Sequence, residues 1–242
     1  MLRTLLCFSF YVLVMLFGAT LSFGQGSDLP NRGADLASRQ LQNVQIKAQS
    51  VETLFTNLSL SYCIPIGLEI ASHDDEFAMY ELDLKEGTLT DLLNQFAKKH
   101  DQYGWEINDG VVSIFPKHNY RDFGLDELLK VQISKFSVKE NTSCWRLVET
   151  LINTAEVQNI IKTYRMTQSG LNFSGAYFPQ LGRNFRLAVS DQPLKTILNT
   201  VVRQSPVAKI WVIKKYRTDQ TFRITLNARN EELPKSTPNV FQ

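Results

Sequence analysis

The chain has 242 residues, of which 43% are hydrophobic and 21% are charged, and its formal net charge is +2 at pH 7. This hydrophobic content excludes an intrinsically disordered chain, which would be poor in hydrophobic residues and strongly charged. The length is sufficient for two small folded domains.

The first 24 residues have the features of a signal peptide. Arg3 supplies the positive charge, the stretch from Leu5 to Phe17 is nearly all apolar, and Ser22-Phe23-Gly24 is a small-residue cleavage site before Gln25. The apolar run is short for a spanning helix, although an uncleaved anchor is an alternative. We therefore predict an exported protein whose mature chain has 242 − 24 = 218 residues.

A strand, a helix and a second strand are predicted between residues 44 and 70, after a flexible leader at residues 25–43. Strands show apolar residues at every second position, and helices show them at spacings of three and four. The residues that carry these patterns are Val44 and Ile46, then Val51, Leu54, Phe55 and Leu58, and then Ile66, Leu68 and Ile70.

The clearest pattern runs from Tyr80 to Pro116 and predicts a strand, a helix and a hairpin. Thr88 and Asp91 have the spacing of a capping box, so a helix is expected to begin there. Asp109-Gly110 is a strong turn signal between two strands. The apolar positions are Tyr80, Leu82 and Leu84, then Leu89, Leu92, Leu93 and Phe96, then Trp105 and Ile107, and then Val112 and Ile114.

The same order of elements is predicted again between residues 130 and 228, after a linker at residues 118–129 and before a disordered tail at residues 229–242. An insert at residues 155–182 holds an extra amphipathic helix. The patterned residues are Val131 and Ile133; Leu147, Val148, Leu151 and Ile152; Val157, Ile160, Ile161 and Tyr164 in the insert; Gly170 to Phe173; Phe185 to Val189; Leu194, Ile197, Leu198 and Val201; Trp211 and Ile213; and Phe222, Ile224 and Leu226.

The two predicted helices that follow Thr88 and Pro193 echo each other at a constant offset, 194 − 89 = 105. Leu89, Leu92, Leu93 and Asn94 correspond to Leu194, Ile197, Leu198 and Asn199, and Trp105 corresponds to Trp211 after one insertion. We interpret the echo as an internal duplication. The predicted fold class is α+β, with two repeated small modules at residues 44–117 and 130–228, each β-α-β-β-α-β-β with helices packed on short sheets.

This arrangement resembles the short N-terminal domain of bacterial secretins and TonB-dependent transducers. The resemblance rests on Thr88-Leu89, Leu92-Leu93, Trp105 to Ile107 and Val111 to Ile114, and on Pro193-Leu194, Ile197-Leu198 and Trp211 to Ile213 in the second module. It implies a bacterial protein that is periplasmic or associated with the cell envelope. It also implies the role of the family domain, which is a docking piece of a larger machine.

No catalytic, cofactor-binding or metal-binding residues are predicted, and we expect a protein that is not an enzyme. The histidines are His73, His100 and His118, and none has the spacing of a metal-binding motif. Nucleophile-elbow, phosphate-loop and dinucleotide-binding motifs are also absent from the sequence. An enzyme of an unrecognised type is the third alternative for function, because sites can assemble in space.

Two cysteines remain after removal of the leader, Cys63 and Cys144. An even number in an exported chain allows one disulfide. Such a bond would have to cross between the modules, so two separately buried thiols are the favoured interpretation.

Charge divides the mature chain into an acidic and a basic part. Residues 25–157 carry 12 Lys and Arg against 20 Asp and Glu, a balance of 12 − 20 = −8, and residues 158–242 carry 13 against 4, a balance of +9. Such asymmetry affects the choice of partners more than the fold. Export argues against nucleic acid as a partner.

The sequence therefore predicts a non-enzymatic envelope protein that acts as a docking module. The expected partner is an envelope protein, which includes a second copy or a secretion or transport component. The candidate contact residues are Lys162, Arg165, Tyr177, Phe178, Arg183 and Arg186, because cations and aromatic rings are common interface anchors. The alternative is binding of an anionic envelope polymer or membrane surface by the basic second module, with Lys214, Lys215 and Arg217 added.

Overall fold

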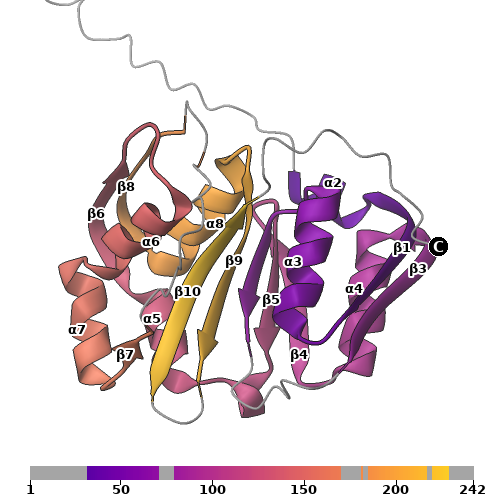
Figure 1. Cartoon of the computed structure of the whole chain (residues 1–242), viewed down its shortest axis with the longest axis horizontal. Helices are drawn as coiled ribbons and strands as arrows, with labels where there is room; N and C mark the ends of the chain where they lie inside the picture. Colours follow the sequence, from indigo (N-terminus) through magenta and orange to yellow (C-terminus); the bar gives the residue numbers. More distant parts are fainter. Residues whose placement is uncertain (1–31, 71–78, 170–180, 182–184, 217–219, 229–242) are drawn as a thin grey trace, which may run out of the picture. The chain divides into compact units, whose positions relative to one another are not determined.

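Helices are interspersed with single strands and pairs of strands along the described part of the chain (Figure 1). The computed structural model describes residues 32–70, 79–169, 181, 185–216 and 220–228. The predicted α+β class is confirmed. The elements of the first half are α2 (Arg32–Ala37), β1 (Gln40–Ala48), α3 (Val51–Tyr62), β2 (Ile66–Glu69), β3 (Tyr80–Thr88), α4 (Leu89–Lys99), β4 (Tyr103–Asn108) and β5 (Val111–Pro116).

A short 3-10 helix, η1 (His118–Tyr120), and helix α5 (Phe123–Lys130) lead into the second half. The remaining elements are β6 (Gln132–Val138), α6 (Cys144–Ile152), α7 (Ala155–Thr163), β7 (Thr167–Gln168), β8 (Leu187–Pro193), α8 (Leu194–Gln204), β9 (Ala208–Lys215) and β10 (Thr221–Ala228). Helix α7 is the extra amphipathic helix that the spacing of Val157 and Ile161 predicts, and both side chains are buried.

The described strands form two small antiparallel sheets, β1–β3 and β6–β8, and one six-stranded sheet in the order β4-β5-β2-β9-β10-β7. Strand β2 of the first half and β9 of the second pair in parallel, with Ile66 opposite Ile210 and Glu69 opposite Ile213. The central sheet is therefore continuous across both halves of the chain. The sequence prediction of separate short sheets in each module does not include this shared sheet.

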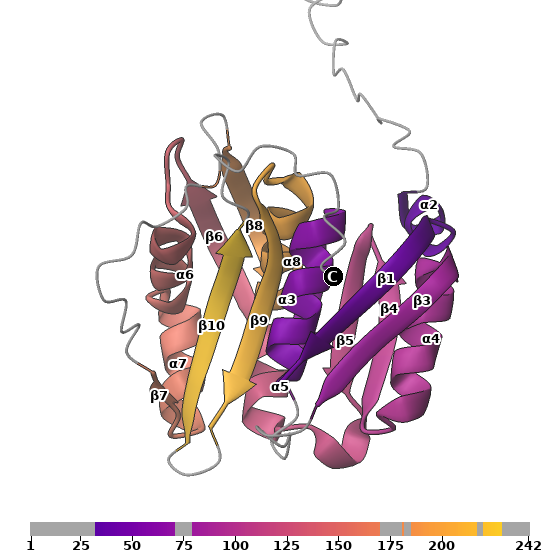
Figure 2. The ribbon, with the colours of Figure 1, turned by 45° about the vertical axis from the view of Figure 1, so that its right-hand side comes forward.

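Helices lie on both faces of the six-stranded sheet (Figure 2), and each face carries its own apolar core. In the first core, helices α3 and α4 lie between the sheet and the β1–β3 pair. In the second core, helices α6 and α8 lie between the opposite face and the β6–β8 pair. Strand β9 serves both, because Ile210 and Val212 belong to the first core and Trp211 and Ile213 to the second.

Local signals that were readable in the sequence set the ends of several elements. Thr88 and Asp91 form the predicted capping box at the start of α4, and the hydrogen bonds from the backbone N–H and hydroxyl of Thr88 lower the pKa of the Asp91 carboxyl. Asp109 and Gly110 both have positive φ, 53° and 74°, as the tight hairpin turn between β4 and β5 requires.

Two predicted boundaries differ from the structure. Residues 32–43, assigned to the flexible leader, form α2 and the start of β1, where Leu36 and Leu41 are buried. Residues 123–129, assigned to the linker, lie in α5, whose buried side chains join the second core. Both segments are short, and their apolar residues are buried against parts of the core that are distant in sequence. Such short segments form stable structure only through this tertiary packing.

The two cysteines do not form a disulfide, and only one of them is buried. Cys144 opens α6 inside the second core, where burial raises the pKa of its thiol to about 12. Cys63 is exposed, which corrects the expectation of two buried thiols. It ends α3 in the left-handed conformation, with φ of 51°, and that turn directs its side chain away from the core.

Some predicted segments lie outside the described residues: the signal peptide, residues 25–31 of the leader, the strand at Gly170 to Phe173, residues 174–180 and 182 of the insert, and the tail. Among the helices that the structure describes, none has the length and apolar character needed to cross a membrane.

Candidate functional site

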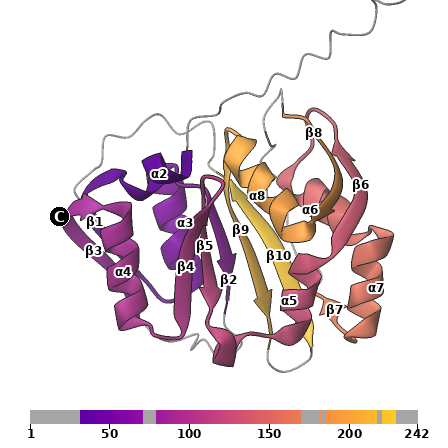
Figure 3. The same ribbon diagram turned by 180° about the vertical axis from the view of Figure 1, so that it is seen from behind.

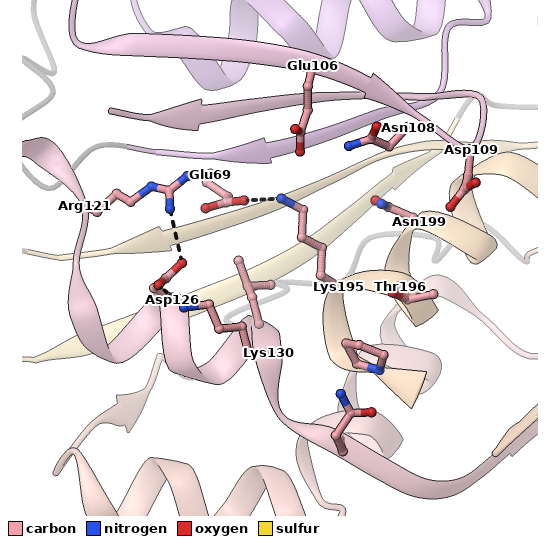
Figure 4. Close-up of a pocket in the computed structure, with 13 residues that line it drawn as sticks. Glu69, Glu106, Asn108, Asp109, Arg121, Asp126, Lys130, Lys195, Thr196 and Asn199 are labelled. Carbon is pink, nitrogen blue, oxygen red and sulfur yellow. Dashed lines mark hydrogen bonds and ion pairs between the residues drawn. The ribbon is translucent and has the colours of Figure 1, made fainter. Parts of the chain in front are cut away.

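A polar pocket of about 440 Å³ lies beside the β4 end of the six-stranded sheet (Figure 4). Strands β2 and β4 contribute to its floor, the first turns of α8 form one wall, and α5 forms the other. We call it the α5–α8 pocket. Its lining residues are Glu69, Glu106, Asn108, Asp109, Arg121, Asp126, Leu129, Lys130, Gln132, Pro193, Lys195, Thr196 and Asn199.

Small residues on the same face of the sheet let Trp211 pack closely beside the pocket. Ser113 of β5 lies opposite both Gly67 of β2 and Glu106 of β4, so these three positions share one face of the sheet. A Cβ atom at Gly67 would lie 2.5 Å from the Trp211 indole, which shows that the indole lies directly over this glycine. The Trp211 Nε1 donates a hydrogen bond of 2.8 Å to the Asn199 Oδ1 at the pocket wall. The sheet and α8 are thereby held together at the edge of the pocket.

A partly buried ion pair joins the two halves of the chain inside the pocket. The Lys195 Nζ of α8 lies 2.9 Å from the Glu69 Oε1 of β2, and the side chains are 28% and 12% exposed. The Lys195 Nζ also lies 5.8 Å from the centre of the Phe115 ring, and the Arg121 guanidinium lies 5.2 Å from the same ring. Two cations therefore contact one aromatic ring, an arrangement that holds both in place.

The α5 wall has its own charge network. Asp126 pairs with Arg121 at 3.6 Å and with Lys130, and the hydrogen bond from Lys130 raises the pKa of that lysine. The start of α5 is held by Asp122, which accepts a hydrogen bond from the Leu125 N–H and forms a 2.7 Å ion pair with Lys215 of β9. The cations of this wall are therefore compensated by carboxylates of the same wall.

Two carboxylates at the β4 side of the pocket have no such compensation. The side chains of Glu106 and Asp109 are exposed, and neither forms an ion pair or a side-chain hydrogen bond with the described residues. The Arg203 guanidinium comes close to Asp109, but it donates its hydrogen bond of 3.1 Å to the backbone carbonyl. The unpaired charge of the pocket is negative and lies along β4.

Strand β4 is also an edge of the six-stranded sheet, and no described strand pairs with its outer side. Trp105 and Ile107 are half-buried against the first core, on the face opposite the pocket. Helix α2 lies near the end of β4 that leads into β5 (Figure 3). At the other edge of the sheet, β7 is only two residues long.

Of the candidate contact residues from the sequence, the three that the structure describes lie in two separate places. Lys162 and Arg165 are exposed at the end of α7. Arg186 precedes β8 and donates a hydrogen bond of 2.8 Å to Glu140, which follows β6. In Figure 1 the end of α7 lies near β7, whereas the start of β8 lies at the opposite end of the second half. The other three candidates, Tyr177, Phe178 and Arg183, lie outside the described residues.

The α5–α8 pocket was missed by sequence reasoning because its residues come from four separate segments, 69, 106–109, 121–132 and 193–199. Its traces in the sequence are Gly67 and Gly104, isolated glycines inside strand patterns, where another group often approaches the backbone closely. Within the described ranges, no group of three or more His, Cys, Asp and Glu side chains is placed to hold a metal ion.

Comparison of the chain with models of protein families, with curated proteins and with solved structures finds no match.

Proposed function

We propose that this chain is an exported, non-enzymatic protein of the bacterial cell envelope that docks another envelope protein by adding a strand of that protein to β4. One observation carries the proposal. Among the described strands, hairpin β9–β10 has a neighbour on each side, β2 and β7, whereas hairpin β4–β5 has a neighbour on one side, β2. Addition of a partner strand to an open sheet edge is an established mode of recognition.

The backbone of β4 is oriented for such a contact. Asn108 and Val111 flank the two-residue turn, so they form the hydrogen-bonded pair that closes the hairpin. Hydrogen-bonded and non-bonded pairs alternate along an antiparallel ladder. Counting back from Asn108, the N–H and C=O groups of Ile107 and Trp105 therefore point outward, where a partner strand can bond to them.

The proposal includes the internal duplication and the resemblance to the short N-terminal domain of secretins and TonB-dependent transducers. Both halves follow the order β-α-β-β-α-β-β, with α7 added in the second. Both also place a parallel strand beside the second strand of a hairpin, β2 beside β5 and β7 beside β10. These parallels support two copies of one docking domain, in which no described strand pairs with the outer side of β4 in the first copy.

The alternative, an anionic envelope polymer or membrane surface bound by the basic half, has less support. Arg186 pairs with Glu140, Lys215 with Asp122 and Arg223 with Glu52. These three cations are compensated by carboxylates of the same chain, so part of the excess positive charge of the sequence is neutralised within the described residues. The observed geometry favours the open edge of β4 as the contact surface.

The variant Ile107→Pro tests the docking proposal. Proline removes the outward N–H of Ile107 without removing a hydrogen bond to β5, so the chain is expected to fold but to lose its partner. The measurement is recovery of partner protein by the tagged mature chain from its own envelope fraction, at low salt and at a few hundred millimolar salt. Strand addition should persist at the higher salt, whereas binding led by charge should collapse.

The control for this experiment is Ile107→Val, which keeps the N–H and most of the apolar contact. Partner recovery that is unchanged in Ile107→Pro, or that disappears at the higher salt in the unmodified chain, would contradict strand addition at β4. Circular dichroism of each variant would establish that it folds.

Export is proposed from the first 24 residues. Mass spectrometry of the native protein is expected to find a new N-terminus near Gln25, because the small residues before it suit cleavage. An intact Met1 in the membrane fraction would indicate an uncleaved anchor. An intact Met1 in the cytoplasm would show that the chain is not exported.

A further inference from the structure

We infer that the β4 edge selects an extended partner segment in which apolar residues alternate with lysine or arginine. This inference rests on the proposed strand addition and specifies its chemistry. A strand beside β4 places its side chains alternately on the two faces of the sheet, next to the β4 side chains of the same face. The two faces of β4 differ, and each sets a different requirement.

The first face requires apolar side chains. Trp105 and Ile107 pack against the first core but remain partly exposed, and no described strand lies on the outer side of β4. A cross-strand apolar neighbour would cover this remaining surface, and aromatic and β-branched residues pair well across strands. A charged side chain at these positions would lose hydration without gaining a partner.

The second face requires a cation. Glu106 points from this face into the α5–α8 pocket (Figure 4), and Asp109 follows in the turn. The other acids of the pocket are neutralised, Glu69 by Lys195 and Asp126 by Arg121 and Lys130. Glu106 and Asp109 are therefore the carboxylates that remain for an incoming ammonium or guanidinium group, and Glu106 is the one that lies on β4 itself.

Neutral polar groups beside Glu106 can bind the remaining donors of such a cation. Asn108 shares its face of β4, and Thr196 lies across the pocket on α8; no hydrogen bond of either side chain is found among the described residues. The charge of residues 25–157, with a balance of −8, also attracts a cationic segment and repels an acidic one. These features identify the occupant as a basic, alternating segment of another protein.

The test uses the mature chain and three fluorescent octapeptides, with valine alternating with lysine, with threonine or with glutamate, at physiological ionic strength. Fluorescence anisotropy is expected to show the valine–lysine peptide binding most tightly. Glu106→Lys should weaken its binding about fivefold, because an opposite-charge cross-strand pair becomes a like-charge pair. The matched control is Glu86→Lys, which makes the same charge change on an exposed residue of β3.

Two further measurements distinguish strand addition from simple charge attraction. Two N-methylated versions of the peptide are made, one with the odd-numbered and one with the even-numbered amides methylated. One version loses the N–H groups that would face β4, and this version is expected not to bind. Ile107→Pro in the protein should likewise abolish binding. Equal binding of both methylated peptides, or an equal effect of Glu86→Lys, would show non-specific attraction and overturn the inference.

The failure of this inference differs from the failure of the proposed function. If the valine–threonine peptide binds as well as the valine–lysine peptide and Ile107→Pro removes both, strand addition stands and the preference for a cation is wrong. If no peptide binds, the β4 edge is not a strand acceptor and both proposals fail. If sedimentation shows a dimer of the chain that Ile107→Pro dissociates, the occupant is a second copy and the inference is overturned.

Discussion

Replacing Leu198 with alanine is expected to lower the free energy of unfolding by about 2–5 kcal/mol, and Leu93→Ala is expected to have an effect of the same size. Both side chains have 0% exposure, and each lies on a helix held between a two-stranded sheet and the six-stranded sheet. Truncation would leave a cavity that the sheets on both sides prevent from closing. Chemical denaturation of the mature chain, followed by circular dichroism, measures the change.

The controls for these variants are Gln95→Ala on α4 and Gln204→Ala at the end of α8, both exposed. Their effects should stay within about 0.5 kcal/mol, as expected for surface sites. If either leucine could be truncated without loss of stability, the proposed equivalence of α4 and α8 would fail. The two leucines belong to different cores, so the double variant should show nearly additive losses.

Gly67→Ala is expected to destabilise the chain by about 1–3 kcal/mol, although it adds only one methyl group. The new Cβ would lie 2.5 Å from the Trp211 ring, which is fully buried and bonded to Asn199. Neither the strand nor the ring can move without disturbing the β2–β9 junction. Thermal unfolding, with tryptophan fluorescence as the signal, measures the loss.

Gly104→Ala is the matched control, because its Cβ would lie 2.9 Å from the Phe115 ring. Phe115 is only half-buried, so its ring can move toward solvent and the cost should be smaller. Combining Gly67→Ala with Trp211→Phe should cost less than the sum of the two single changes, because the smaller ring leaves room for the methyl group. Equal costs for the two glycine variants would show that the β2–β9 junction is not tightly packed.

The β2–β9 junction also matters for the proposed docking site. It makes one sheet of two halves, and it places α8 and α5 of the later segments over the strands of the first half. Without that junction, the hairpin β4–β5 would have an open edge but no charged pocket beside it. The specificity that we infer therefore depends on the pairing of segments more than 140 residues apart in the sequence, Ile66 with Ile210.

The sequence alone determined most of the local structure. Alternation predicts β3 and β10, helical spacing predicts α4, α6 and α8, and the capping box and the Asp109-Gly110 turn locate two boundaries. These features depend on neighbouring residues, so local periodicity and backbone preferences are sufficient to reveal them. The predicted hairpin gives the strands β4 and β5 of the docking proposal. It does not show that β4 is the open edge, because the strand that pairs with the hairpin comes from a distant segment.

Only the tertiary structure decided how the halves combine and where charge remains unpaired. The apolar run Ile210 to Ile213 is typical of a strand covered on both faces. The run does not indicate which other strand pairs with it. Likewise, the charge count of residues 158–242 cannot show that Lys195 and Lys215 are neutralised by Glu69 and Asp122. Strand pairing and ion pairing between distant segments depend on which surfaces meet in space, and that information is spread over the whole chain.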